Sequence, residues 1–211
     1  MPVEPTTLAA FSLAAIAVYL APGVDIAFIA SRGINHGRRA GVVAGMGIAL
    51  GVAIQAAASA LGVTALFLAS PILFEIIRWT GVAYLCWLGL SVLRGGDERP
   101  EVARERSWSV AGTMSKGAGI NLLNPKVALF FLAFLPQFVD PARGDVTVQL
   151  AFLGGFFAAG SVVWCGALGL VFGSLGARFS GSDLFRRWQR RVTGTAFIGF
   201  AAALGFADVR R

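Results

Sequence analysis

The sequence predicts an all-α integral membrane protein whose six transmembrane helices form two inverted repeats of three. Hydrophobic residues make up 56% of the 211 residues and charged residues only 14%, whereas a soluble domain carries about 25% charged residues. Several apolar runs exceed the roughly 20 residues that a helix needs to cross a bilayer. Two of these runs are broken at related positions, Pro22-Gly23 and Asn124-Pro125. We therefore expect one polytopic membrane domain over residues 1–211.

The first repeat is predicted to cover about residues 6–94 and to contain three spans. The first span runs from about residue 6 to 30 and is interrupted at Pro22-Gly23, because proline lacks the backbone donor that a helix needs. A short polar loop follows, with the second span at about 41–68 and the third at about 71–93. The second span carries four glycines at spacings that allow another helix to approach closely, which predicts a packing seam: Gly41, Gly45, Gly47 and Gly51.

A polar connector of mixed charge is predicted at about residues 95–116, followed by the second repeat at about 117–208. Its fourth span, at about 117–139, is broken at Asn124-Pro125. A turn at 140–145 leads to a glycine-rich fifth span at about 146–175. An amphipathic, arginine-rich segment at 180–192 then lies at the membrane interface and leads to the sixth span, at about 193–206.

The distribution of basic residues predicts the orientation of these spans. The loops after the first, third and fifth spans hold 3, 5 and 5 Lys or Arg residues, against 3 in total on the other side. Because cytoplasmic loops carry the excess of Lys and Arg, both termini are predicted to face outward from a bacterial cytoplasmic membrane. The net charge of +7 therefore reflects membrane orientation and lipid contact, and nucleic acid is not an expected partner.

Each broken span carries one ionisable residue, Asp25 in the first and Lys126 in the fourth. Charges inside a membrane are costly and usually mark a pathway for ions or substrates. Paired broken helices in inverted repeats are typical of secondary transporters, and their exposed helix ends attract carboxylate, ammonium or cations. An amino acid carries both charges, so it suits such a site. We expect Asp25 to exchange a proton and Lys126 to hold a substrate carboxylate, unless the two form a permanent structural ion pair.

Other residues in the broken spans and the second span are candidates for binding a substrate: Pro22, Gly23, Asn121, Asn124, Pro125 and Gln55. Asn121 and Asn124 have an alternative role in capping the second break. Gln55 has an alternative role in a hydrogen bond between two helices. Glu75 and Arg78, three residues apart on the third span, form either a gate or an ordinary interfacial ion pair.

The sequence gives no support to an enzyme, a metal site or a bound cofactor. The single histidine, His36, falls in a predicted loop, and the two cysteines, Cys86 and Cys165, form no CxxC pair. The cysteines are expected to pack as small apolar residues.

Five ordered blocks resemble the LysE/RhtB family of amino-acid exporters: Pro22-Gly23-Val24-Asp25, residues 37–47 (GRRAGVVAGMG), residues 81–89 (GVAYLCWLG), Asn124-Pro125-Lys126 and residues 135–139 (LPQFV). The resemblance covers about residues 12–205, although the family usually has proline where this chain has Val24. It implies export of amino acids or related small metabolites, driven by the proton gradient. The alternatives are a channel for small polar solutes and a non-transporting membrane scaffold or subunit, and a homodimer is left open.

Overall fold

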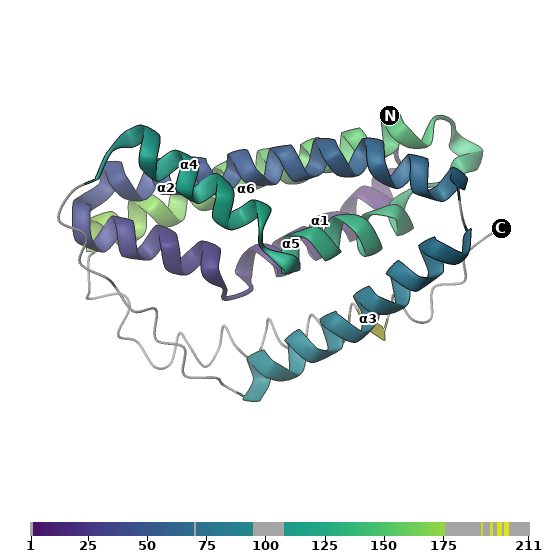
Figure 1. The fold of residues 1–211 in the computed structure, drawn as a ribbon, viewed down its shortest axis with the longest axis horizontal. Coiled ribbons are helices and arrows are strands. Elements are labelled where there is room, and N and C mark those ends of the chain that lie inside the picture. The colour runs from purple at the N-terminus through teal and green to yellow at the C-terminus, as the bar shows by residue number, and fades with distance from the viewer. Residues whose placement is uncertain are drawn as a thin grey trace.

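The computed structural model describes residues 2–69, 71–94 and 108–175, together with residues 191, 195, 198–199 and 201–202. All regular structure in these ranges is helical, which confirms the all-α prediction (Figure 1). The α-helices are α1 (Pro5–Leu20), α2 (Val24–Ala69), α3 (Pro71–Arg94), α4 (Val110–Leu122), α5 (Pro125–Leu129) and α6 (Val146–Leu175).

Two described helices contain a stretch long and apolar enough to cross a membrane, one within Val24–Gly62 of α2 and one at Val146–Ser174 of α6. A third candidate is the pair Val110–Leu122 and Pro125–Phe138, whose parts are bent by 51° at the break. The described residues thus fit a helical membrane protein. The full set of six spans and the inverted repeat remain predictions, because the amphipathic segment at 180–192 and most of the sixth span lie outside the described residues.

The first predicted break is present between α1 and α2. Helix α1 ends at Leu20, and Ala21 takes an extended conformation (φ −60°, ψ 119°) before α2 begins at Val24. Because Pro22 cannot donate a backbone hydrogen bond, the helical bonding is interrupted where the sequence predicts.

The predicted polar loop at residues 31–40 is wrong in extent. These residues are helical except at Gly37, whose φ of 80° lies in the left-handed region that favours glycine. A Cβ built on Gly41 would lie 3.0 Å from the Cα of Gly33, whereas residues eight apart in a continuous helix are about 12 Å apart. The chain therefore folds back at Gly37, and α2 consists of two antiparallel helical parts (Figure 1).

The glycines of the second span are packing positions, as predicted. A Cβ on Gly41 would lie 2.5 Å from the carbonyl oxygen of Gly169 in α6, and one on Gly47 would lie 2.5 Å from that of Met114 in α4. Real Cβ atoms do not approach backbone so closely. The seam therefore has two faces, one against α6 and one against α4, and both require small residues for the helices to touch.

Helix α4 begins at Val110, inside the stretch predicted as connector, and so starts earlier than the predicted fourth span. The reason is local: the side chain of Ser109 caps the helix by accepting a hydrogen bond from the Gly112 N–H at 3.1 Å. The second break follows α4 as predicted. After α5 the chain continues as a π-helical turn (Phe130–Phe134) and a 3₁₀ turn (Leu135–Phe138). Single π-helical turns are frequent at functional sites.

A group of aromatic side chains packs the two halves of the described chain together. Phe11 of α1 and Phe157 of α6 contact Phe130, with ring centroids 6.0 and 5.0 Å from it. All three are almost fully buried. Aromatic pairs at these separations are favourable beyond the area that they bury, so this cluster supports the helices around the first and second breaks.

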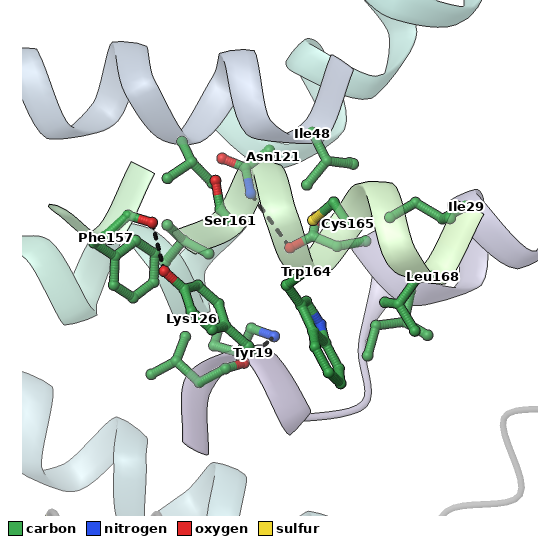
Figure 2. Close-up of a pocket in the computed structure, with 15 residues that line it drawn as sticks. Tyr19, Ile29, Ile48, Asn121, Lys126, Phe157, Ser161, Trp164, Cys165 and Leu168 are labelled. Atoms are coloured by element: carbon green, nitrogen blue, oxygen red, sulfur yellow. Dashed lines mark hydrogen bonds between the residues drawn. The ribbon is translucent and has the colours of Figure 1, made fainter. Parts of the chain in front are cut away.

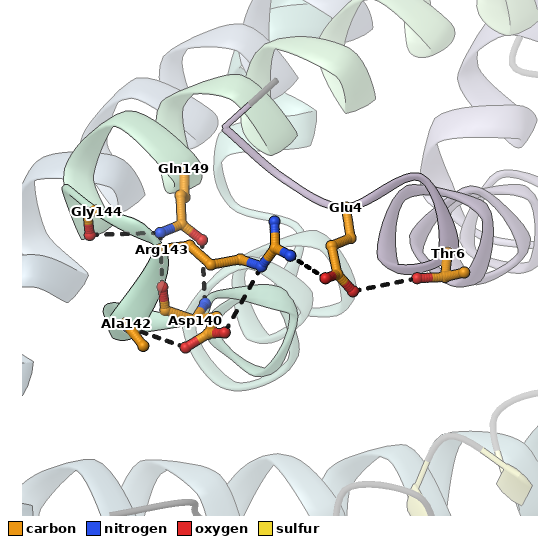
Figure 3. A network of polar contacts seen from close by, with 7 residues as sticks. All are labelled: Glu4, Thr6, Asp140, Ala142, Arg143, Gly144 and Gln149. Carbon is orange, nitrogen blue, oxygen red and sulfur yellow. Dashed lines mark hydrogen bonds and ion pairs between the residues drawn. The ribbon is translucent and has the colours of Figure 1, made fainter.

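Polar contacts join the start of α1 to the turn before α6 (Figure 3). Glu4 forms an ion pair with Arg143, and Gln149 donates to the carbonyl oxygen of Asp140 at 2.8 Å. Asp145 accepts from the N–H groups of residues 147 and 148 at the start of α6, and these hydrogen bonds hold the pKa of its carboxyl below the usual value. The N-terminal segment and the 140–145 turn therefore lie at the same end of the molecule, as the predicted topology requires.

The predicted orientation can be tested with two exposed positions at opposite ends, Ala142 in the turn and Ala111 at the start of α4 (Figure 1). In a variant with Cys86 and Cys165 replaced by alanine, we expect Ala142→Cys to react with an impermeant maleimide in intact spheroplasts. Ala111→Cys should react only after permeabilisation. The opposite pattern of labelling would contradict the predicted orientation.

Candidate functional site

The two breaks and α6 enclose a cavity of about 30 Å³ (Figure 2). Both ionisable residues singled out from the sequence, Asp25 and Lys126, line it. Their exposed fractions are only 7% and 6%. The structure thus brings together, in one buried place, two charges that are about a hundred residues apart in the chain.

Asp25 lies in the first turn of α2, where the helix dipole favours a negative charge. One carboxylate oxygen, Oδ2, accepts from the side-chain amides of Asn124 at 2.8 Å and Asn121 at 3.3 Å. The other oxygen, Oδ1, is buried and has no hydrogen-bond partner among the described residues. One oxygen of this carboxylate is therefore held by the second break, and the other can take a proton or a donor from a ligand.

Lys126 lies in the first turn of α5, but its ammonium reaches the C-terminal end of α1. Its Nζ donates to the carbonyl oxygens of Ala21 at 3.2 Å and Val18 at 3.3 Å. The C-terminal end of a helix carries partial negative charge and unpaired carbonyls, so it suits an ammonium group. The first break thus holds the cation of the second half, while the second break holds the anion of the first half.

Among the described ion pairs there is none between Asp25 and Lys126. The permanent ion pair considered from the sequence is therefore not the arrangement in this structure. Each charge is instead held by hydrogen bonds to neutral groups across the break, so either side chain can change partner without separating a salt bridge.

The two asparagines hold the second break together. The side-chain oxygen of Asn124 accepts from the Lys126 N–H at 3.0 Å and so caps α5. The backbone carbonyl of Asn121 accepts from Gln55 Nε2 at 2.6 Å. Asn121 lines the cavity, whereas Asn124 and Gln55 do not. For Asn124 and Gln55 the structure thus displays the capping and helix-bridging roles.

The remaining candidates lie outside the cavity wall. Pro22 and Pro125 form the breaks but do not line the cavity, and Pro125 is exposed. Gly23 faces the lysine: a Cβ built there would lie 3.6 Å from Lys126 Nζ. Glu75 is on α3, none of whose described residues lines the cavity, and the side chain of Arg78 lies outside the described residues.

Sequence reasoning missed the contribution of α6 to the site. Phe157, Ser161, Trp164, Cys165 and Leu168 all line the cavity. They recur at the three- and four-residue spacing of one helix face, a signal that was present in the sequence. It was hidden because the fifth span is apolar on all sides, so its periodicity does not distinguish a cavity wall from a lipid-facing surface.

The cavity has room for water in this conformation. A volume of about 30 Å³ exceeds the roughly 10–15 Å³ that admits one water molecule. An amino acid that binds here would also have to replace the hydrogen bonds that now hold the two charges. Both charges are held by hydrogen bonds that cross the two breaks, so separating the breaks would free them together.

Residues 16–207 match the family model described as LysE type translocator. The chain is 34% identical to an uncharacterised membrane protein of Pseudomonas aeruginosa, over 94% of each chain. It is 29% identical to a leucine efflux protein of Enterobacter sp., over 92% of each chain. It is also 32% identical to a homoserine/homoserine lactone efflux protein of Salmonella typhimurium, over 67% of this chain and 68% of that protein. No solved structure shows significant similarity to the chain.

Proposed function

This chain belongs to the LysE type translocator family, and from that membership we propose that it is a secondary transporter exporting amino acids in exchange for protons. It would act as a multi-pass protein of the bacterial cytoplasmic membrane. Two of the similar proteins are named for the efflux of leucine and of homoserine or its lactone, which supports a small amino acid or a derivative as the substrate.

The observation that supports transport most directly is the reciprocal binding of charges across the two breaks. The C-terminal end of α1 holds Lys126, and the second break holds Asp25. Helix breaks at membrane depth persist only where they are buried in protein or line a cavity. A substrate with an ammonium and a carboxylate group can replace these internal contacts with its own, which couples its binding to movement of the two halves. This exchange also supports the inverted-repeat arrangement.

Asp25 is proposed as the proton carrier. Its Oδ2 is occupied by two amide donors, whereas its Oδ1 has no partner among the described residues. A proton on Oδ1 would leave the contacts to the second break in place. The charge in the cavity would change by one unit, and this change is what an antiporter needs to link proton and substrate binding.

The burial of both charges supports a transporter with alternating access rather than a channel. At 7% and 6% exposure, Asp25 and Lys126 have little contact with solvent. A continuous pore would leave such groups hydrated. Buried charges at paired helix breaks are what a transporter shows between its inward-open and outward-open states.

The test is efflux of labelled leucine from proteoliposomes containing the purified protein. With the outside medium two pH units more acidic than the lumen, the proton gradient can support about a hundredfold substrate gradient for one-to-one exchange. We expect efflux to be accelerated under this gradient and to lose the acceleration when a proton ionophore is added. Efflux with the same rate in both conditions would indicate a channel or uniporter, and no efflux of any amino acid would favour a scaffold.

A further inference from the structure

Trp164 lines the cavity from α6 (Figure 2), and we propose that its indole N–H binds the carboxylate of a neutral amino acid with an aliphatic side chain. The inference deepens the proposed function and rests on it, because it takes the cavity as the substrate site. It assigns a binding residue to α6 and narrows the substrate class.

The indole nitrogen of Trp164 is buried and has no hydrogen-bond partner among the described residues. An indole N–H can only donate. Buried donors are nearly always paired in folded proteins, so each exception calls for an explanation. Since this donor belongs to a residue of the cavity wall, a ligand in the cavity is the natural source of its acceptor.

The same cavity offers an acceptor of the opposite kind. Asp25 Oδ1 is also buried and without a partner among the described residues. A ligand that satisfies both atoms must carry a donor group and an acceptor group, as the ammonium and carboxylate of an amino acid do. Lys126 offers a further donor to the ligand's carboxylate. An ammonium has three N–H donors, and among the described residues two carbonyls accept from it.

The rest of the wall determines which side chain the amino acid can carry. Ile29, Ile48 and Val52 of α2 and Leu168 of α6 provide an apolar surface. Among the described residues of the wall, Asp25 and Lys126 are the only charged ones, and both are engaged by the substrate's own ammonium and carboxylate. A charged substrate side chain would be buried there without a counter-charge, which is strongly unfavourable. Leucine and similar amino acids fit this wall, whereas lysine and glutamate do not.

The test compares ligand binding to the detergent-purified wild-type protein and to Trp164→Phe, which keeps an aromatic ring and removes the donor. The probes are leucine and isopentylamine, which is leucine without its carboxylate. Losing one hydrogen bond to a charged group should raise the Kd of leucine about tenfold and leave that of isopentylamine unchanged. Trp87→Phe is the matched control, because Trp87 is 61% exposed on α3, and it should change neither value.

An unchanged Kd of leucine in Trp164→Phe would overturn the assignment. Equal weakening of leucine and isopentylamine would also overturn it, because that result means a packing role for the ring. Tighter binding of lysine or glutamate than of leucine would overturn the substrate class. The proposed function fails on a separate measurement: leucine binding that depends on Trp164 without any gradient-driven efflux would contradict export while supporting this site.

Discussion

Replacing Asp25 by asparagine is expected to abolish proton-driven leucine efflux and to leave an exchange of leucine that needs a higher leucine concentration. Asparagine keeps the shape of the side chain, and its oxygen can still accept from Asn124 and Asn121, which now bond Asp25 Oδ2. It cannot carry a proton through the cycle. Efflux under a pH gradient should fall to the level of protein-free liposomes. Exchange of labelled against unlabelled leucine at equal pH needs no net proton movement. It should therefore continue at leucine concentrations high enough to offset the weaker binding of the ammonium to an uncharged side chain.

Asp145→Asn is the matched control, because Asp145 is an exposed aspartate that accepts from backbone N–H groups at the start of α6. Asparagine also caps helices well, so this variant should transport at the wild-type rate. The comparison separates the loss of the buried titratable group from a general effect of removing one negative charge.

The double variant Asp25→Asn with Lys126→Met tests whether Asp25 acts only as a structural partner of the lysine. Removing one member of a buried pair costs about 3–5 kcal/mol, whereas removing both can be nearly neutral. Because the two groups form no direct ion pair here, we expect Asp25→Asn alone to lower the free energy of unfolding by less than this amount. Recovery of proton-driven efflux in the double variant would contradict the proton-carrier role of Asp25.

Replacing Gly169 by valine is expected to prevent the helices from packing. A Cβ on Gly169 would lie 2.6 Å from the backbone nitrogen of Val42 and closer still to the carbonyl of Gly41. Backbone cannot move aside as a flexible side chain does, so α2 and α6 must separate. The loss of stability should reach or exceed the upper end of the roughly 1–3 kcal/mol typical of overpacked cores. We expect a lower Tm in detergent and aggregated protein on size-exclusion chromatography.

Gly155→Val provides the control on the same helix, because nothing lies within 4 Å of a Cβ built at Gly155. Its effect should stay within about 0.5 kcal/mol, as for most surface substitutions. Equal Tm values for the two variants would show that close contact between α2 and α6 does not hold the fold together.

Features that depend on a few neighbouring residues could be predicted from the sequence alone. Pro22 and Pro125 each lie inside an apolar run, where a proline interrupts the helix because it has no N–H to donate, and both breaks are present. The helices at the predicted third and fifth spans have nearly the predicted bounds, Pro71–Arg94 and Val146–Leu175. The glycines at 41, 45, 47 and 51 predicted close helix contact because small side chains permit it in any membrane protein.

Only the tertiary structure decided how these parts meet. Nothing in the local sequence shows that Lys126 bonds to the end of α1 while Asp25 bonds to the second break, because these contacts join residues about a hundred positions apart. The fold-back at Gly37 and the position of the Trp164 face of α6 at the cavity also depend on contacts between residues far apart in the chain. In a chain that is apolar almost throughout, hydrophobic pattern no longer separates core from surface. The contacts between helices therefore depend on how the helices pack, and this packing is seen only in the folded structure.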